Sequence, residues 1–204
     1  MPIQARFIAV CAAVLCLALA APCLAGPCTE DNEAPGIFVP DRGCFELGLG
    51  YQYQHFSVLG SKFDTNGVSA DIGMHLVDLV TGNVGRLTLG AEGTLIGGFG
   101  GHTGGSPSLD VKSLFLGGGP HIAVANSSRF EPWIHGLVGL EHLRFTQTAT
   151  LGSNSAFGYM VGAGVDIRLK RAVYWRLQGD YLGTHFNSGL QPNYSAGTGI
   201  LFYF

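Results

Sequence analysis

Strict two-residue alternation of apolar and other side chains is the feature that most constrains how this chain folds. In VSADIGMHL (68–76), every second residue from the first is apolar, and the residues between are Ser, Asp, Gly and His. The same alternation runs through RLTLGAEGTL, YMVGAGVDIRL and VYWRLQGDYL. Successive side chains of a β-strand point to opposite faces, whereas a helix repeats its face every 3.6 residues. The pattern therefore predicts strands.

Eight segments of this kind follow one another along the chain. Their expected ranges are 44–57, 67–79, 85–97, 110–125, 131–145, 156–169, 173–185 and 194–204. Short turns are expected near Thr81, at 126–129 and at Lys170, and long loops at 58–67, 97–108, 146–154 and 187–193. An even number of strands, with short turns at one end and long loops at the other, is typical of an outer-membrane barrel.

The polarity of the two strand faces separates a membrane barrel from a soluble sandwich. The chain is 47% hydrophobic and only 12% charged, against about 25% charged in average domains. A soluble sheet would carry dense Lys, Glu and Thr on its minor face, but here that face carries Gly, Ser and sparse charges of both signs. Such a face suits the narrow interior of an eight-stranded barrel. Aromatic residues near strand ends suit interfacial girdles, namely Tyr51, Tyr53, Trp133, Tyr159, Trp175, Tyr181 and Phe202.

The first 25 residues have the form of a secretory signal peptide. Arg6 precedes the apolar stretch FIAVCAAVLCLALAA, and small residues follow at a candidate cleavage site. We therefore divide the chain into a signal peptide at 1–25, a periplasmic segment at 26–43 and a barrel at 44–204. Cys28 and Cys44 remain after cleavage, and export favours a disulfide between them over two free thiols.

The final strand accounts for the apolar chain end. Ile200, Phe202 and Phe204 share one face of SAGTGILFYF. Here the chain resembles bacterial outer-membrane β-barrels, whose terminal strand ending in Phe is read by the barrel assembly machinery. Together with FGYMVGAGVDIRL and WRLQGDYLGTHF, this strand is similar to the last three strands of the small OmpA-like family, in a barrel-only form without a peptidoglycan-binding domain. The resemblance covers 44–204 and implies an all-β, eight-stranded antiparallel up-and-down transmembrane barrel in the bacterial outer membrane.

Charged residues on the minor face are expected inside this barrel. An Arg that faces lipid at the membrane centre costs about 2–4 kcal/mol, and a buried charge needs a partner. We expect a filling network of ion pairs, and the alternative is a gated ion path or proton relay. The residues concerned are Glu46, Asp71, Arg86, Glu92, Glu141, Asp166, Arg168, Arg176 and Asp180.

These features favour a non-enzymatic structural, membrane-integrity or surface-interaction protein. The alternatives are a narrow channel and a lipid A deacylase-like enzyme that uses His185 and Ser188, although those two residues have opposite strand parity and 194–204 contains no acid. The seven His form no HxH or HxxxH pair, so we expect no metal and no cofactor. The net charge of −3, without a basic patch, argues against nucleic acid. We expect a monomer whose partners are outer-membrane lipid, lipopolysaccharide and the barrel assembly machinery.

Replacement of Phe204 by Asp should impair membrane insertion more than any single loop substitution. The terminal strand closes the barrel and, by the resemblance, carries the assembly signal. Surface levels measured by cell-surface labelling and outer-membrane fractionation test this expectation. Normal surface levels of the Phe204→Asp chain would contradict it.

Overall fold

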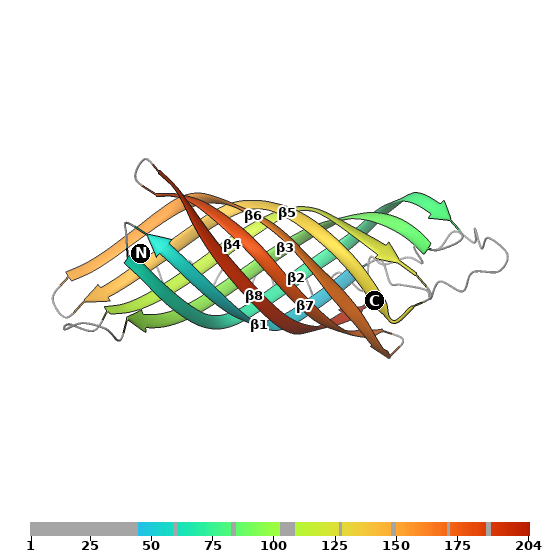
Figure 1. Ribbon diagram of the computed structural model, residues 1–204, viewed down its shortest axis with the longest axis horizontal. Helices are drawn as coiled ribbons and strands as arrows, with labels where there is room; N and C mark the ends of the chain where they lie inside the picture. The colour runs from blue at the N-terminus through green and yellow to red at the C-terminus, as the bar shows by residue number, and fades with distance from the viewer. Residues whose placement is uncertain are drawn as a thin grey trace.

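Eight antiparallel strands form one closed barrel, as the alternation predicts (Figure 1). The computed structural model describes residues 45–58, 61–82, 85–102, 109–126, 128–147, 150–170, 172–186 and 189–204. The signal peptide, the 26–43 segment and the Cys28–Cys44 disulfide expected above lie outside these residues. The strands are β1 (Phe45–Val58), β2 (Ser61–Gly82), β3 (Gly85–His102), β4 (Leu109–Ala125), β5 (Phe130–Gln147), β6 (Thr150–Lys170), β7 (Val173–Phe186) and β8 (Gly189–Tyr203).

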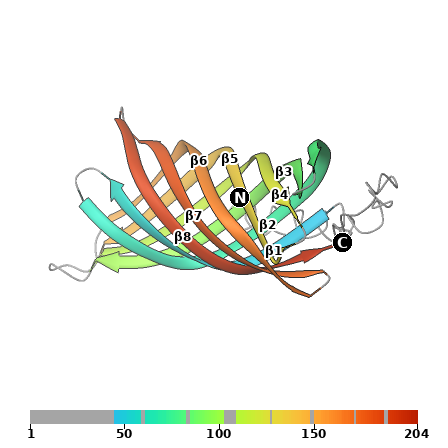
Figure 2. The ribbon, with the colours of Figure 1, turned by 45° about the vertical axis from the view of Figure 1, so that its right-hand side comes forward.

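The barrel closes where the first strand meets the last. β1 pairs with β8 from Glu46 opposite Tyr203 to His55 opposite Tyr194. The ladder is completed at its end by the Phe204 amide, which donates to the Phe45 carbonyl at 2.9 Å. All strands wrap obliquely around the long axis (Figures 1 and 2). Closure leaves no open edge, which is the condition for a sheet to cross a membrane.

The strands extend well beyond the ranges expected from the sequence. β2 has 22 residues and β6 has 21, and the expected long loops at 58–67, 146–154 and 187–193 are largely strand. That expectation was wrong because polar residues occupy both faces of these extensions, so the apolar alternation disappears there. β3 likewise continues to His102. The extensions lie at the barrel end opposite Phe45 and Phe204, which we call the hairpin end; the other is the terminal end.

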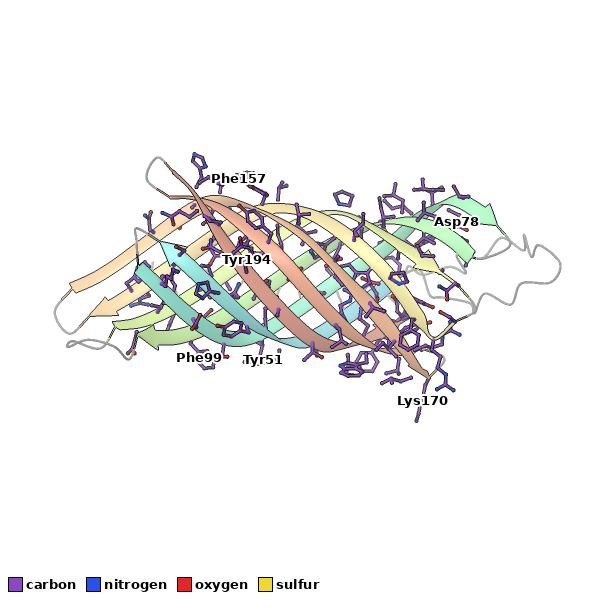
Figure 3. All side chains as sticks on the ribbon, in the orientation of Figure 1. Tyr51, Asp78, Phe99, Phe157, Lys170 and Tyr194 are labelled. Atoms are coloured by element: carbon purple, nitrogen blue, oxygen red, sulfur yellow. The ribbon has the colours of Figure 1, made fainter. Side chains whose placement is uncertain are left out.

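The outer surface carries an apolar band that ends at a ring of aromatic residues. Tyr51, Phe99, Phe157 and Tyr194 are exposed on four different strands and lie at a similar position along the long axis (Figure 3). Toward the hairpin end the outward side chains become polar. Trp133 was also expected in a girdle, but this was wrong, because its side chain is buried inside the barrel. The described residues contain no helix long and apolar enough to span a membrane.

The interior is divided into two stacked layers of different chemistry. Charged and polar side chains fill the half nearer the terminal end. The half nearer the hairpin end is filled mainly by an apolar cluster, with Gln54, Thr65, Ser113 and Glu141 buried beside it. This cluster was not anticipated from the sequence, since small and charged residues were expected throughout. We call these residues the apolar plug, namely Phe56, Phe63, Ile96, Val111, Phe115, Leu137, Leu143, Ala156, Met160 and Leu182.

Candidate functional site

A cluster of buried ionisable groups occupies the terminal half of the barrel interior. Because inward residues alternate along each strand, the closed sheet brings charges from β1, β2, β3, β4, β5, β6 and β7 to one level. We call this cluster the ionic layer and define it as Glu46, Asp71, Glu92, His121, His135, Asp166, Arg176 and Asp180.

Arg176 is the cation at the centre of the ionic layer. Its Nε and Nη2 donate to the two oxygens of Asp166 at 2.9 and 3.0 Å, a side-on bidentate pair. Its Nη2 lies 3.5 Å from Glu46 Oε1, and its guanidinium lies 4.6 Å from the Trp133 ring centroid. The Trp133 Nε1 also donates to Asp166 at 3.0 Å. One guanidinium thus organises carboxylates from two strands far apart in sequence.

His135 bridges two further carboxylates. Its Nδ1 lies 3.2 Å from Glu92 Oε1, and its Nε2 lies 3.2 Å from Asp180 Oδ1. The other Asp180 oxygen accepts hydrogen bonds from Gln52 Nε2 at 3.0 Å and Ser195 Oγ at 2.9 Å. These contacts link β3, β5, β7, β8 and β1 across the lumen.

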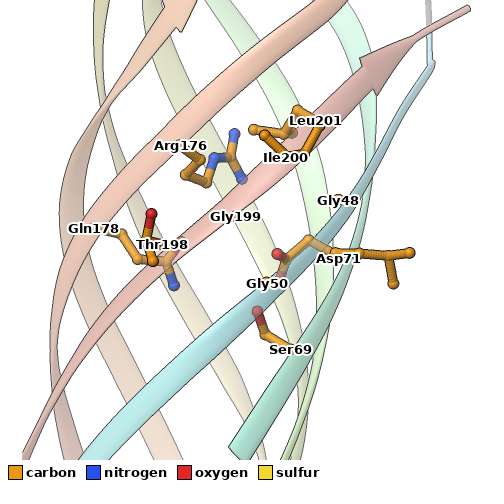
Figure 4. A pocket seen from close by; sticks show the side chains of 11 residues that line it. Gly48, Gly50, Ser69, Asp71, Arg176, Gln178, Thr198, Gly199, Ile200 and Leu201 are labelled. Carbon is orange, nitrogen blue, oxygen red and sulfur yellow. The ribbon is translucent and has the colours of Figure 1, made fainter.

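Glycines at the β1–β8 seam make room for the charged side chains. Gly50 pairs with Gly199, and a Cβ on either would lie within 2.8 Å of a carbonyl oxygen of the opposite strand. Beside them is a recess whose size is on the order of one water molecule, bordered by Asp71, Arg176 and Gln178 (Figure 4). The Asp71 carboxylate accepts a hydrogen bond from Thr94 there.

Two other arginines pair near the terminal rim, outside the ionic layer. Arg168 Nη2 lies 3.1 Å from Glu131 Oε1 and also donates to two turn carbonyls, those of Asn126 and Ser128. Arg86 Nη1 lies 3.0 Å from Asp78 Oδ2. Neither acid was among the partners anticipated from the sequence. The structure therefore brings Glu46, Asp71, Glu92, Asp166, Arg176 and Asp180 together and leaves Arg86 and Arg168 at the rim.

Glu141 departs from the expected ion pairing. It is fully buried, but it lies opposite Phe115 and Ala156 in the sheet register, beside the apolar plug. Neither of its carboxylate oxygens has a hydrogen-bond partner within the described strands. Strand parity placed Glu141 inside the barrel, but parity does not show which residues of the adjacent strands lie beside it. Its neighbours on β4 and β6 are apolar.

Comparison with known proteins identifies the family. The family model for the outer membrane protein beta-barrel domain matches residues 9–202. The chain belongs to this family. The crystal structure of Neisserial surface protein A is similar, with a TM-score of 0.60 at 13% identity over 78% of this chain and 97% of that one. Ail, the attachment invasion locus protein of Yersinia pestis, solved with the heparin analogue sucrose octasulfate, gives 0.54 at 15% identity with the same coverage. These likenesses show a shared fold, and no curated protein matches in sequence.

Within this outer-membrane barrel, sequence reasoning missed several interior residues. His121, His135, Glu131 and Trp133 all point inward. The signal was present on β5, because Glu131, Trp133 and His135 share parity with Glu141, which had been assigned to the interior. Histidines at both parities in WIHGLVGLEHL obscured it.

The residues suggested for a deacylase-like site do not form one in the described strands. His185 is exposed near the hairpin end of β7, and Ser188 lies outside the described residues. A different pair, His142 Nδ1 and Ser155 Oγ, lies 2.8 Å apart on the outer surface, next to the aromatic ring. A nucleophile–base–acid arrangement needs a third group to orient the His, and no described carboxylate is hydrogen-bonded to His142.

Replacing Arg176 with Met should lower the free energy of unfolding by about 3–5 kcal/mol, because it leaves Asp166 and Glu46 as uncompensated buried charges. Urea titrations of the refolded barrel, followed by its gel mobility without boiling, measure the change. Arg129→Met is the matched control, since Arg129 is exposed in a turn, and it should change stability by less than about 0.5 kcal/mol. Equal stabilities for the two variants would show that the Arg176 pairs contribute little.

Proposed function

We propose that this protein is a non-conducting, non-enzymatic barrel of the bacterial outer membrane that holds lipopolysaccharide at its outer surface. Its export would use the 1–25 signal peptide, with a Cys28–Cys44 disulfide formed in the periplasm. Insertion by the barrel assembly machinery would read Ile200, Phe202 and Phe204. The terminal end would then face the periplasm and the hairpin end the exterior.

The filled lumen is the observation that carries the non-conducting part of the proposal. An ion crossing the barrel would meet both interior layers in series. Phe56, Phe115 and Leu143 of the apolar plug are completely buried, with no exposed surface. Below them, Arg176 and Asp166, opposite each other on β6 and β7, are joined by two hydrogen bonds inside the barrel. A tightly packed apolar layer is a large barrier to ions, because a charge loses its hydration there.

Purified barrel in planar lipid bilayers should show no channels of steady size. The Phe63→Ser, Phe115→Ser variant should increase leak events, because it places water-compatible side chains in the plug. The matched control is Phe99→Ser, Phe157→Ser, which removes two rings from the outer surface and should not increase leak. Steady wild-type conductance would favour the channel instead.

A pair of cations beyond the aromatic ring supports the lipopolysaccharide part. Lys112 on β4 and Arg144 on β5 are directly opposite each other, face outward and are exposed. Like charges placed opposite each other destabilise a sheet. Neither side chain forms an ion pair or hydrogen bond with another described residue. An external anion would relieve this repulsion.

The height of this pair matches the headgroup region. Leu140 and Phe157 pair at the edge of the apolar band, and Arg144 lies four residues farther along β5. Four residues of a strand tilted by about 40° rise roughly 10 Å along the membrane normal. Phosphate groups of lipid A lie at the headgroup level, and Arg binds phosphate bidentately. Ail, of similar fold, has been crystallised with a sulfated saccharide analogue, so a barrel of this shape is compatible with an anionic sugar partner.

No described carboxylate forms an ion pair with Lys112 or Arg144. His55 Nδ1 lies 2.7 Å from Asp64 Oδ1 beyond the aromatic ring, and this hydrogen bond lowers the pKa of Asp64. Asp110 is the next outward residue beyond Lys112, yet it forms no ion pair with Lys112 in the structure's described part. Lys112 and Arg144 therefore lie opposite each other without a described carboxylate that a phosphate would have to displace.

Barrel extracted from outer membranes in mild detergent should retain lipopolysaccharide, and Lys112→Gln, Arg144→Gln should retain several-fold less. Lys170→Gln, Arg129→Gln removes the same charge from exposed sites at the terminal end and should retain the wild-type amount. Equal retention by both variants would contradict the proposed contact. Mass spectrometry of the same lipid A should show an unchanged acyl pattern; a change that depends on His142, Ser155 or His185 would indicate an enzyme instead.

A further inference from the structure

Three buried residues of the ionic layer bring possible metal ligands together. Glu46 on β1, Glu92 on β3 and His121 on β4 can each offer one ligand atom, and these atoms lie within 4.8 Å of one another. Each residue is more than nine-tenths buried and has a polar atom without a hydrogen-bond partner among the described residues, namely Glu46 Oε1, Glu92 Oε2 and His121 Nε2. A buried polar atom without a hydrogen bond costs free energy, so three such atoms in one cluster indicate a missing ligand.

The charge balance of the ionic layer indicates the sign of that ligand. The layer holds five carboxylates, on Glu46, Asp71, Glu92, Asp166 and Asp180. Arg176 is its one guanidinium, and its imidazoles are those of His121 and His135. With His135 protonated and His121 neutral, as a metal-bound imidazole must be, the layer carries three more negative than positive charges. Buried charge must be compensated, and a divalent cation would offset two of these three negative charges.

We propose that Glu46, Glu92 and His121 bind a divalent first-row transition metal ion, and that Zn²⁺ fits them best. Carboxylate oxygen and imidazole nitrogen are both zinc ligands, and three protein ligands leave the fourth tetrahedral position open to water. Magnesium and calcium prefer all-oxygen ligands, so the imidazole selects against them. The three residues come from different strands, and the sequence expectation of no metal rested on the absence of closely spaced His pairs.

The surrounding contacts suit this ligand set. Tetrahedral zinc with bonds of 2.0–2.2 Å places its ligand atoms about 3.4 Å apart. His121 Nε2 and Glu92 Oε2 are 4.0 Å apart, so binding needs a shift of only side-chain ends. His135 holds the other oxygen of Glu92 at 3.2 Å, an outer contact that orients a metal-binding carboxylate. Arg176 would release Glu46 Oε1, at 3.5 Å, and keep its two bonds to Asp166.

Zinc titration of the full exported chain tests the site. Protein refolded in detergent is stripped with EDTA, dialysed and titrated with Zn²⁺, and bound metal is counted by elemental analysis. Wild-type barrel should bind one Zn²⁺ at micromolar or lower concentration. Zinc should also raise the temperature at which the folded gel mobility is lost, because a ligand that binds the folded state stabilises it.

Variants assign the binding to the three residues. His121→Gln and Glu46→Gln should each weaken zinc binding roughly tenfold or more and abolish the thermal shift, with gel mobility confirming that each barrel is folded. His142→Gln removes an exposed outer His, and Cys28→Ser, Cys44→Ser removes competing thiols; both should bind zinc as the wild type does. Two results would overturn the proposal: no zinc bound at about 100 μM, or binding that survives in His121→Gln and Glu46→Gln.

Discussion

Backbone hydrogen bonding in lipid is the constraint on which the rest of this structure depends. Hydrocarbon offers no partner to an unpaired amide or carbonyl, so the sheet must close. Here closure is completed by the last residue, since Phe204 pairs with Phe45 at the end of the β1–β8 ladder. Closing with eight strands fixes a radius so small that side chains must fill the interior. Large side chains in the lumen are therefore needed for packing, whether or not they also have a function.

The narrow lumen is filled by the inward side chains of every strand, and in the ionic layer many of these are carboxylates. The result is an excess of buried negative charge. Small residues such as Gly50 and Gly199 let the strands approach each other, and a few large side chains fill the remaining interior volume. Arg176 compensates two carboxylates and packs over Trp133. The layer nevertheless holds more carboxylates than cations. Its stability must therefore depend on bound protons or on a bound cation.

Sequence alternation predicted the faces of β2, β3, β6 and β7 but not those of β5, and it did not show which residues of neighbouring strands meet. On β6 and β7, Asp166 and Arg176 could be assigned to the interior because each is flanked by apolar residues facing lipid. That Arg176 pairs with Asp166, Arg168 with Glu131 and Glu141 with no described residue depends on register and barrel tilt, which a single strand does not encode. The strand extensions at the hairpin end were missed for a related reason. Water surrounds their outer face, so polar residues occur at both parities.

The two interior layers stabilise the closed barrel in different ways. At the hairpin end, the apolar plug needs no specific partners, so the wall there can carry polar outward residues such as Lys112 and Arg144 without disturbing the interior. At the terminal end, the ionic layer is specific, because removing one member leaves its partners buried and uncompensated. The proposed surface contact and the internal ion pairs thus lie at different heights of the same sheet. Substitutions at the proposed contact should therefore be separable from those that unfold the barrel.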